Sequence, residues 1–219
     1  SDRDQRTRAI LMTSSATLHV RATATLRGGK LLRDGQVAGH SNKQSLAEIT
    51  DDLYAQVQME YPRFYKEDLQ CKTGMLAAHV LLRDWKEVRA EEVAVVIMNR
   101  SGSLDADIKY QATVETIPSP ALFVYTLPNI LIGEICIRYG FKGENLFLVS
   151  EHFDAELLTE TVTQLFNEGT VKYCICGWCE ATTAQHECLL WLVEINDHAA
   201  REKIFNTETC KTQYLNNHG

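Results

Sequence analysis

The segment that most constrains the fold is residues 93–98, VAVVIM, an unbroken apolar run in which four of the six residues are β-branched. A run of this kind, without alternating polar positions, is typical of a strand buried on both faces of a sheet. It leads into the loop at 99–103, NRSGS, which contains small residues. Ligands of open α/β sheets bind at the carboxyl ends of the strands. This loop is therefore a candidate binding position.

The rest of the chain mixes strands and helices, which indicates an α/β domain. Residues 18–26 alternate like a strand, with one apolar face formed by Leu18, Val20, Ala22, Ala24 and Leu26. The turn RGGK at 27–30 joins this strand to a partner over 31–37, which predicts an N-terminal β-hairpin. Further strands are expected over residues 146–149, 171–179 and 188–195.

Helices are expected over residues 46–60, 72–85, 126–139, 153–168 and 197–206. Ser45 suits the N-cap of the first of these helices. Pro128 falls in the first turn of the helix at 126–139, where a missing N–H costs nothing, and Gly169 ends the helix at 153–168. We expect an extension with a hairpin over residues 1–40 and one main domain over 41–219.

Composition sets limits on function. The chain has 219 residues, enough for one domain, and its 45% hydrophobic content allows a real core. No apolar stretch approaches the length of a membrane span, and the polar start SDRDQRTR predicts no signal peptide. A net charge of −7 argues against broad nucleic-acid binding. Seven cysteines without framework spacing indicate reduced thiols in the cytoplasm. Residues 1–35 are basic and could contact an acidic partner or simply be solvated.

Two consecutive segments resemble β-ketoacyl synthases, the condensing enzymes of fatty-acid and polyketide assembly. Residues 117–145 read IPSPALFVYTLPNILIGEICIRYGFKGEN, and residues 147–169 read FLVSEHFDAELLTETVTQLFNEG. The first resembles the segment that leads into the family's active site, and the second resembles its nucleophile elbow of strand, turn and helix. The resemblance extends over about residues 41–180. It implies a thiolase-like half-fold, with a mixed five-stranded sheet packed with helices in addition to the N-terminal hairpin.

The elbow departs from the family at its nucleophile. Counting from Gly143 without a gap places His152 where the family has the cysteine that attacks the acyl thioester. A thiolate at a helix start is highly nucleophilic, whereas an acyl-imidazole hydrolyses readily and would hold an acyl chain poorly. The family's two catalytic histidines lie in a second half that has no counterpart in this sequence. One interpretation is that His152 only fills the former active-site space and is hydrogen-bonded or partly exposed. The alternative is a remaining hydrolytic or ligand-binding role together with its neighbours Ser150 and Glu151.

The helix after the elbow has one apolar stripe and a polar remainder. The stripe consists of Ala155, Leu158, Val162, Leu165 and Phe166. In complete condensing enzymes this helix lies between two sheets, so both of its sides contact protein. A helix with one polar, solvent-exposed side fits a half-fold that is monomeric or that meets a polar partner surface. The resemblance further implies substrate-binding positions at Phe123, Asn129 and Phe153.

The segment CICGWCE at 174–180 allows two interpretations. With His186 and Cys188 its cysteines could form a zinc site, but zinc normally uses Cys-x-x-Cys knuckles on turns. Cys174 and Cys176 are instead two apart within an expected strand, so packing as small hydrophobes is favoured and no metal is expected. Glu180 matches a structural glutamate of the family. The family analogy also implies dimerisation through residues near 171–178.

The function that the resemblance implies is that of a β-ketoacyl-synthase-like accessory protein without catalytic activity. It would bind an acyl carrier protein or a full-length synthase as a homo- or heterodimer and would need no cofactor. Chain length factors, which also lack the cysteine and pair with an active synthase, are the family precedent. The alternatives are an acyltransferase or thioesterase that uses Ser150, Glu151 and His152, a synthase completed by a separate subunit, and a purely structural homodimer.

Overall fold

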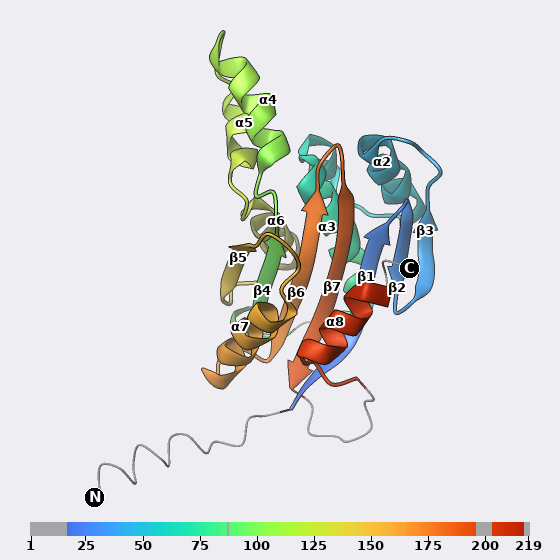
Figure 1. Ribbon diagram of the computed structural model, residues 1–219, viewed down its shortest axis with the longest axis vertical. Coiled ribbons are helices and arrows are strands. Elements are labelled where there is room, and N and C mark those ends of the chain that lie inside the picture. Colours follow the sequence, from blue (N-terminus) through green and yellow to red (C-terminus); the bar gives the residue numbers. More distant parts are fainter. Residues whose placement is uncertain (1–16, 87, 196–202, 217–219) are drawn as a thin grey trace, which may run out of the picture.

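The computed structural model describes residues 17–86, 88–195 and 203–216. Its centre is one seven-stranded mixed sheet with the order β3-β2-β1-β7-β6-β4-β5 (Figure 1). The strands are β1 (Leu18–Arg27), β2 (Lys30–Arg33), β3 (Gln36–His40), β4 (Val93–Asn99), β5 (Asn145–Val149), β6 (Tyr173–Ala181) and β7 (His186–Ile195). β4 runs parallel to both β5 and β6, and the other neighbours are antiparallel. The α/β class and the mixed sheet predicted from the sequence are confirmed, with more strands than the five expected.

Helices cover both faces of the sheet. On one face, α2 (Leu46–Gln56), α3 (Leu69–Leu81) and α6 (Ile130–Tyr139) share a core with alternate residues of β1, β4, β6 and β7. On the other, α7 (Ala155–Asn167) and α8 (Thr207–Asn216) cover the remaining residues of β4, β6 and β7. All seven residues of β4 are buried, because this strand lies between the two helical layers.

β1 does not keep one apolar face, as the alternation had predicted. Its pairing with β7 shifts between Val20 and Ala22, so Arg21 is an extra residue in the ladder. A bulge of one residue reverses the side-chain alternation. Leu18 and Val20 therefore pack with α7 and α8, whereas Ala22, Ala24 and Leu26 pack on the side of α3.

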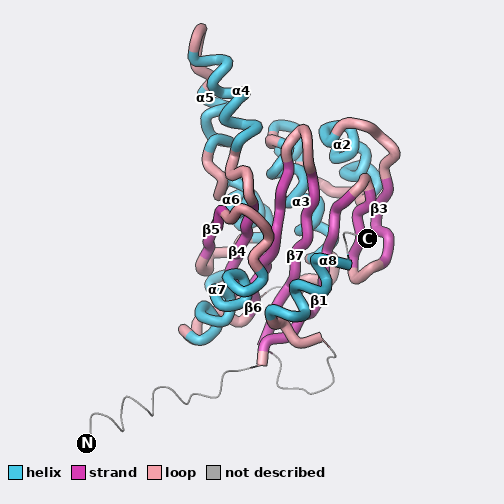
Figure 2. Tube along the Cα trace, in the orientation of Figure 1, coloured by secondary structure: helices cyan, strands magenta, loops and turns pink. Residues whose placement is uncertain are grey.

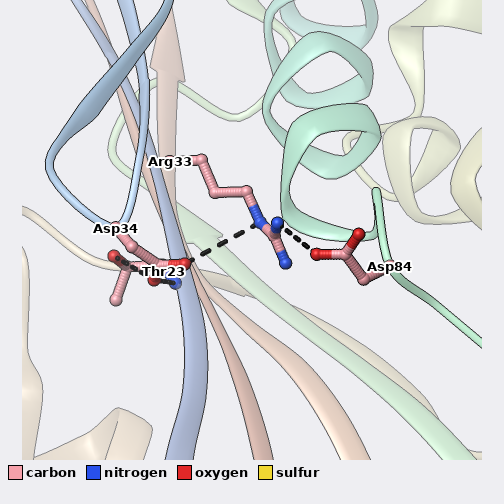
Figure 3. Close-up of polar contacts among 4 residues, drawn as sticks. All are labelled: Thr23, Arg33, Asp34 and Asp84. Atoms are coloured by element: carbon pink, nitrogen blue, oxygen red, sulfur yellow. Dashed lines mark hydrogen bonds and ion pairs between the residues drawn. The ribbon is translucent and has the colours of Figure 1, made fainter.

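The predicted hairpin is a three-stranded meander that continues the main sheet. A second turn at Asp34 and Gly35, both with positive φ, divides the expected partner strand into β2 and β3. Figure 3 shows how this turn is fixed. Asp34 accepts a hydrogen bond from the Thr23 backbone N–H at 2.8 Å, and Arg33 forms an ion pair with Asp84 beyond the end of α3. The meander is thereby joined to the helical layer as well as to β7.

Several helix boundaries differ from the predictions because the caps lie elsewhere. Asp68 caps α3, which therefore begins before Lys72. Residues 126–139 are not one helix: Pro120 opens the short helix α5 (Pro120–Phe123), which is followed by the 3₁₀ turn η3 (Val124–Thr126). Leu127 is extended, the conformation favoured before a proline, so Pro128 precedes α6 and does not lie in its first turn.

The helix expected over residues 197–206 lies mostly outside the described residues. Residues 203–206 are not helical, and Ile204 instead forms an isolated bridge with His19. The helix that the structure shows after this segment is α8, in the tail that the sequence pattern had left unassigned. Its Asn206 side chain accepts from the backbone N–H of Thr209 at 2.8 Å, which is an N-cap bond.

A helical arm projects from the carboxyl edge of the sheet (Figures 1 and 2). It consists of α4 (Leu104–Val114), α5 and η3. Only Ala106 of α4 is fully buried, and the Tyr110 and Phe123 rings contact each other at 5.3 Å between centroids. Its exposed large apolar residues are Leu104, Ile108, Val114, Ile117, Phe123, Val124 and Leu127.

Candidate functional site

The candidate site lies where the parallel strands β4, β5 and β6 end. β4 leads into the loop 99–103, and β5 leads into residues 150–154. The two segments are joined directly, because the Ser150 backbone N–H donates to the Asn99 carbonyl oxygen at 2.9 Å. The position matches the general rule for ligand sites of α/β sheets.

The predicted strand–turn–helix elbow is present. β5 ends at Val149, and α7 begins at Ala155, with Asp154 as its N-cap accepting from the Leu157 N–H at 2.9 Å. His152 is exposed at the bend between them, and Glu151 is exposed beside it. Gly169, with φ +85°, follows the end of α7 as predicted.

The three elbow residues proposed for acid–base chemistry do not form a linked group. Within the described part of the chain, the side chains of Ser150, Glu151 and His152 make no hydrogen bond or ion pair with one another. A nucleophile and its base must lie within hydrogen-bond reach. The imidazole is therefore exposed to solvent, with no orienting partner among the described residues.

Phe153, the next residue, is buried. Its ring lies 4.4 Å from that of Tyr214 on α8, 5.8 Å from that of Trp191 and 6.2 Å from that of Trp178, measured between centroids. The elbow thus turns His152 outward and Phe153 into the core between α7, α8 and the sheet. The aromatic cluster, rather than the imidazole, fills the space beneath the bend.

The other two predicted substrate-binding residues lie apart from Phe153. Phe123 is on the arm and is 53% exposed. Asn129 is exposed and precedes the first residue of α6, without a capping hydrogen bond from its side chain. The structure does not bring Phe123, Asn129 and Phe153 into one cavity wall; each has its own surroundings.

A polar network that sequence reasoning found only in part fixes the loop after β4. Glu180, 1% exposed at the end of β6, accepts from the backbone N–H groups of Arg100 at 2.8 Å and Ser101 at 3.1 Å. Buried Asn99 bonds both polar groups of Gly102 and donates to Gln70 on α3 at 3.2 Å. The glutamate had been assigned a structural role from the family pattern; Asn99 and Gln70 carried no signal in the sequence.

A small hollow lies beside this network, between the start of α3, the Ser-Gly-Ser turn and α4. Its lining includes Asp68, Gln70, Ser103 and Lys109. Its free volume of about 10 Å³ is the size that holds a single water molecule. The amide nitrogen of Gln70 and one carboxyl oxygen of Glu180 have no hydrogen-bond partner among the described residues.

The cysteines lie in strands and helices rather than on turns: four are in β6 and β7, and the other three are in α3, α6 and α8. All seven are free thiols. Cys174 and Cys176 face the core under α7, and Cys179 lies directly opposite Cys188 in the antiparallel ladder of β6 and β7. The hydrogen bond with Cys188 and then burial raise the pKa of the Cys179 thiol. These thiols pack as small apolar groups, and among the described residues no cluster of three His, Cys, Asp or Glu side chains is arranged to hold a metal ion.

The expected dimer contact through residues 171–178 is wrong. β6 is hydrogen-bonded to β7 on one side and to β4 on the other, and residues 174–181 are buried. The free edge on this side of the sheet is β5, where Leu146 is 39% and Val149 is 61% exposed. The family analogy predicted that two chains pair through a strand at the sheet edge, but it assigned this pairing to β6, which is an inner strand.

No protein-family model matches the chain, and no curated protein matches it in sequence. Its fold is shared with solved structures of ketosynthases. The ishigamide ketosynthase/chain length factor superposes with a TM-score of 0.64 at 18% identity, over 85% of this chain and 64% of that chain. A structure of the ketosynthase ApeO in complex with its chain length factor ApeC, from Xenorhabdus doucetiae, gives a TM-score of 0.58 at 13% identity, over 82% and 79%. A β-ketoacyl synthase from Burkholderia phymatum gives 0.58 at 10% identity, over 84% and 60%.

The predicted resemblance to β-ketoacyl synthases is thus confirmed at the level of the fold. The chain spans about 64% of the length of the ishigamide ketosynthase/chain length factor chain. No helix in the described ranges has both the length and the apolarity to cross a bilayer; only the bent pair 120–126 and 130–139 reaches that composition, with an angle of 98° between its parts.

Proposed function

We propose that this chain is a non-catalytic β-ketoacyl-synthase-like accessory protein of fatty-acid or polyketide-type biosynthesis, which binds an acyl carrier protein or a full-length ketosynthase. The observation that carries the proposal is the elbow, which has its strand, turn and helix, with Phe153 buried and His152 exposed at the bend. His152 is the residue that the resemblance aligns with the family's cysteine. The similar structures include a ketosynthase with its chain length factor and a ketosynthase with an acyl-carrier protein. The free thiols fit the reducing cytoplasm, where we place it.

The chemistry of the elbow supports a non-catalytic role. Condensation needs a nucleophile that holds the acyl chain as a stable thioester, and an exposed imidazole would release it to water. Within the ranges that the structure describes, His152 also has no hydrogen-bonded partner that could act as base or orienting group. What the fold keeps is a scaffold of the ketosynthase type.

The surface best suited to a protein partner is the β5 edge together with the arm. The outer backbone groups of β5 pair with no strand in the described part of the chain, and an unpaired edge is a template for pairing with another chain. Val149 and Leu146 add apolar side chains along this edge, and the arm projects beyond the carboxyl end of β4 beside it (Figure 1). We propose that a ketosynthase-type partner covers both.

Substituting the edge valine tests this surface. Val149→Lys places a charge in the edge, whereas Val37→Lys places one at a similarly exposed valine, 66% against 61%, on the strand β3 at the opposite edge. We expect Val149→Lys to weaken binding to the full-length ketosynthase of the source organism by about tenfold or more, with Val37→Lys unchanged. Isothermal titration with the purified ketosynthase, and separately with the acyl carrier protein, measures the affinities. If the wild type binds neither protein, the proposed function is contradicted. If both variants lose the same affinity for the ketosynthase, the β5 edge is not the binding surface.

The enzymatic alternative is tested on the same protein. Hydrolysis or transfer of an acyl thioester is measured for wild type and for His152→Ala. We expect no turnover above the uncatalysed rate in either. Turnover by wild type that His152→Ala abolishes would establish an acyltransferase or thioesterase instead.

A further inference from the structure

Glu67 is a buried carboxyl group without a partner. It lies between the 3₁₀ helix η1 (Pro62–Lys66) and the start of α3. The residue is 7% exposed, and neither carboxyl oxygen has a hydrogen-bond partner among the described residues. An ionised carboxylate in such a place would lose its hydration without compensation. The protein therefore has to keep this group neutral or provide a countercharge.

The nearby cations are already engaged with other acids. Arg63 donates to Glu134 of α6 at 2.6 Å, and the Tyr61 hydroxyl donates to the other oxygen of the same carboxyl at 2.7 Å. Lys72 of α3 donates to Asp51 at 2.7 Å. Glu134, itself 3% exposed, thus takes both donors offered by η1. Among the described residues, Arg63 and Lys72 are thus paired with Glu134 and Asp51 rather than with Glu67.

Charged groups on η1, α3 and α6 act on Glu67, and the acids raise its pKa more than the cations lower it. The acids are Glu134 and Asp68, and the cations are Arg63 and Lys72. Glu67 in turn acts on Tyr61, which precedes η1. Tyr125 of η3, at the foot of the arm, and Cys71 of α3 belong to the same buried region, because Glu67, Asp68 and Glu134 all act on both groups.

We propose that Glu67 is a proton-binding site, which is buried between η1 and α3 while it is protonated and loosens the packing of η1 when it loses the proton. The function rests on burial and on the second acid opposite, Glu134. Burial, followed by the negative charges of Glu134 and Asp68, raises the pKa of Glu67 to about 8. Loss of the proton would place a negative charge on a side chain that is only 7% exposed and on which the charges of Glu134 and Asp68 already act.

The charge of Glu67 also acts on Tyr125 of η3, at the foot of the arm. Burial is the main cause that raises the pKa of Tyr125 to about 12, and the charges of Cys71, Glu134, Glu67 and Asp68 add to it. η3, which carries Tyr125, is in turn tied to the loop after β4, since the Ser103 hydroxyl donates to the Thr126 carbonyl at 2.8 Å. A charge on Glu67 would therefore act on η3, where the arm joins the loop after β4, as well as on η1.

Carboxyl-carbon NMR of protein labelled at glutamate tests the proposal directly. Glu67→Gln, which mimics the protonated form, identifies the Glu67 signal by its loss. We expect that signal to titrate near pH 8 in wild type, and in Glu134→Gln to titrate at a lower pH that is still above the ordinary value, because burial is the larger cause. A wild-type midpoint between about pH 4 and 5 would overturn the proposal.

Hydrogen exchange provides the structural readout. We expect the protection factors of amides in η1 to fall in wild type as the pH rises through the Glu67 midpoint, and to stay constant in Glu67→Gln. Equal behaviour of the two proteins would overturn the coupling to η1. Should Glu67→Gln fail to fold, the signal that shifts in Glu134→Gln identifies Glu67, and the wild-type exchange profile carries the test. None of these outcomes depends on the proposed accessory function.

Discussion

Glu180 shows how one buried side chain can organise a loop. Its carboxyl group accepts from two consecutive backbone N–H groups, those of Arg100 and Ser101, which no strand or helix would otherwise satisfy. Gly177, three residues earlier on β6, has a comparable constraint, because a Cβ atom there would lie 2.1 Å from the Leu189 carbonyl oxygen. Gly177 and Glu180, the two ends of the Gly-Trp-Cys-Glu segment, therefore both have a structural role.

Removing the Glu180 carboxyl group is expected to destabilise the chain. Glu180→Ala removes the acceptor of two partly buried backbone N–H bonds, and we expect a total loss of about 1–3 kcal/mol. Glu180→Gln keeps an acceptor oxygen and should lose less. Urea unfolding of the two variants measures the free energies, and a Glu180→Ala variant as stable as wild type would refute the role assigned to these bonds.

At the scale of elements, α7 and α8 enclose the elbow from below. The Thr159 and Thr207 hydroxyls join the two helices at 2.8 Å, and the Tyr214 hydroxyl donates to Glu187 of β7 at 2.9 Å. Cys210 of α8 is fully buried. The apolar stripe of α7 is thereby covered by the sheet and by this chain's own C-terminal helix, while its polar side stays exposed as predicted.

Two adjacent elbow residues should therefore differ in their effect on stability. Phe153→Ala removes a ring packed among Trp178, Trp191 and Tyr214, and we expect a loss of about 3 kcal/mol or more. His152→Ala, at an exposed position, should change the unfolding free energy by no more than about 0.5 kcal/mol. Chemical denaturation followed by tryptophan fluorescence distinguishes the two. A large loss in His152→Ala would mean that the imidazole fills the buried space after all.

For the whole molecule, the buried acids predict how stability depends on pH. The pKa of Glu67 is raised from 4.5 to about 8 on folding, so its contribution favours the folded state fully below about pH 4.5 and is lost as the pH rises to about 8. His79 acts in the opposite direction, because burial lowers its pKa and its contribution is lost as the pH falls.

The difference in unfolding free energy between wild type and Glu67→Gln isolates the contribution of Glu67. We expect wild type to lose unfolding free energy relative to Glu67→Gln between about pH 5 and 9, as measured by urea unfolding across that range. Parallel profiles would contradict the raised pKa of Glu67.

The elements that sequence reasoning predicted well are those specified by nearby residues. The N-cap Ser45, the apolar run of β4 and the elbow before α7 depend on side chains within a few positions of one another. The same local pattern was misleading for β1, where one extra residue, Arg21, moves Leu18 and Val20 to the opposite face from Ala22.

By itself, the sequence determined the α/β class and the strand–turn–helix elbow, since these follow from periodicity and caps; the position of His152 at the family's thiol stays a prediction from the resemblance. Only the tertiary structure decided that β5 rather than β6 is the free edge, that α8 and Phe153 close the space under the elbow, and that Glu67 lies buried near Glu134. The physical reason is that strand order and burial come from pairing and packing between residues far apart in the chain. A strand buried on both faces has the same apolar composition whichever neighbours it pairs with.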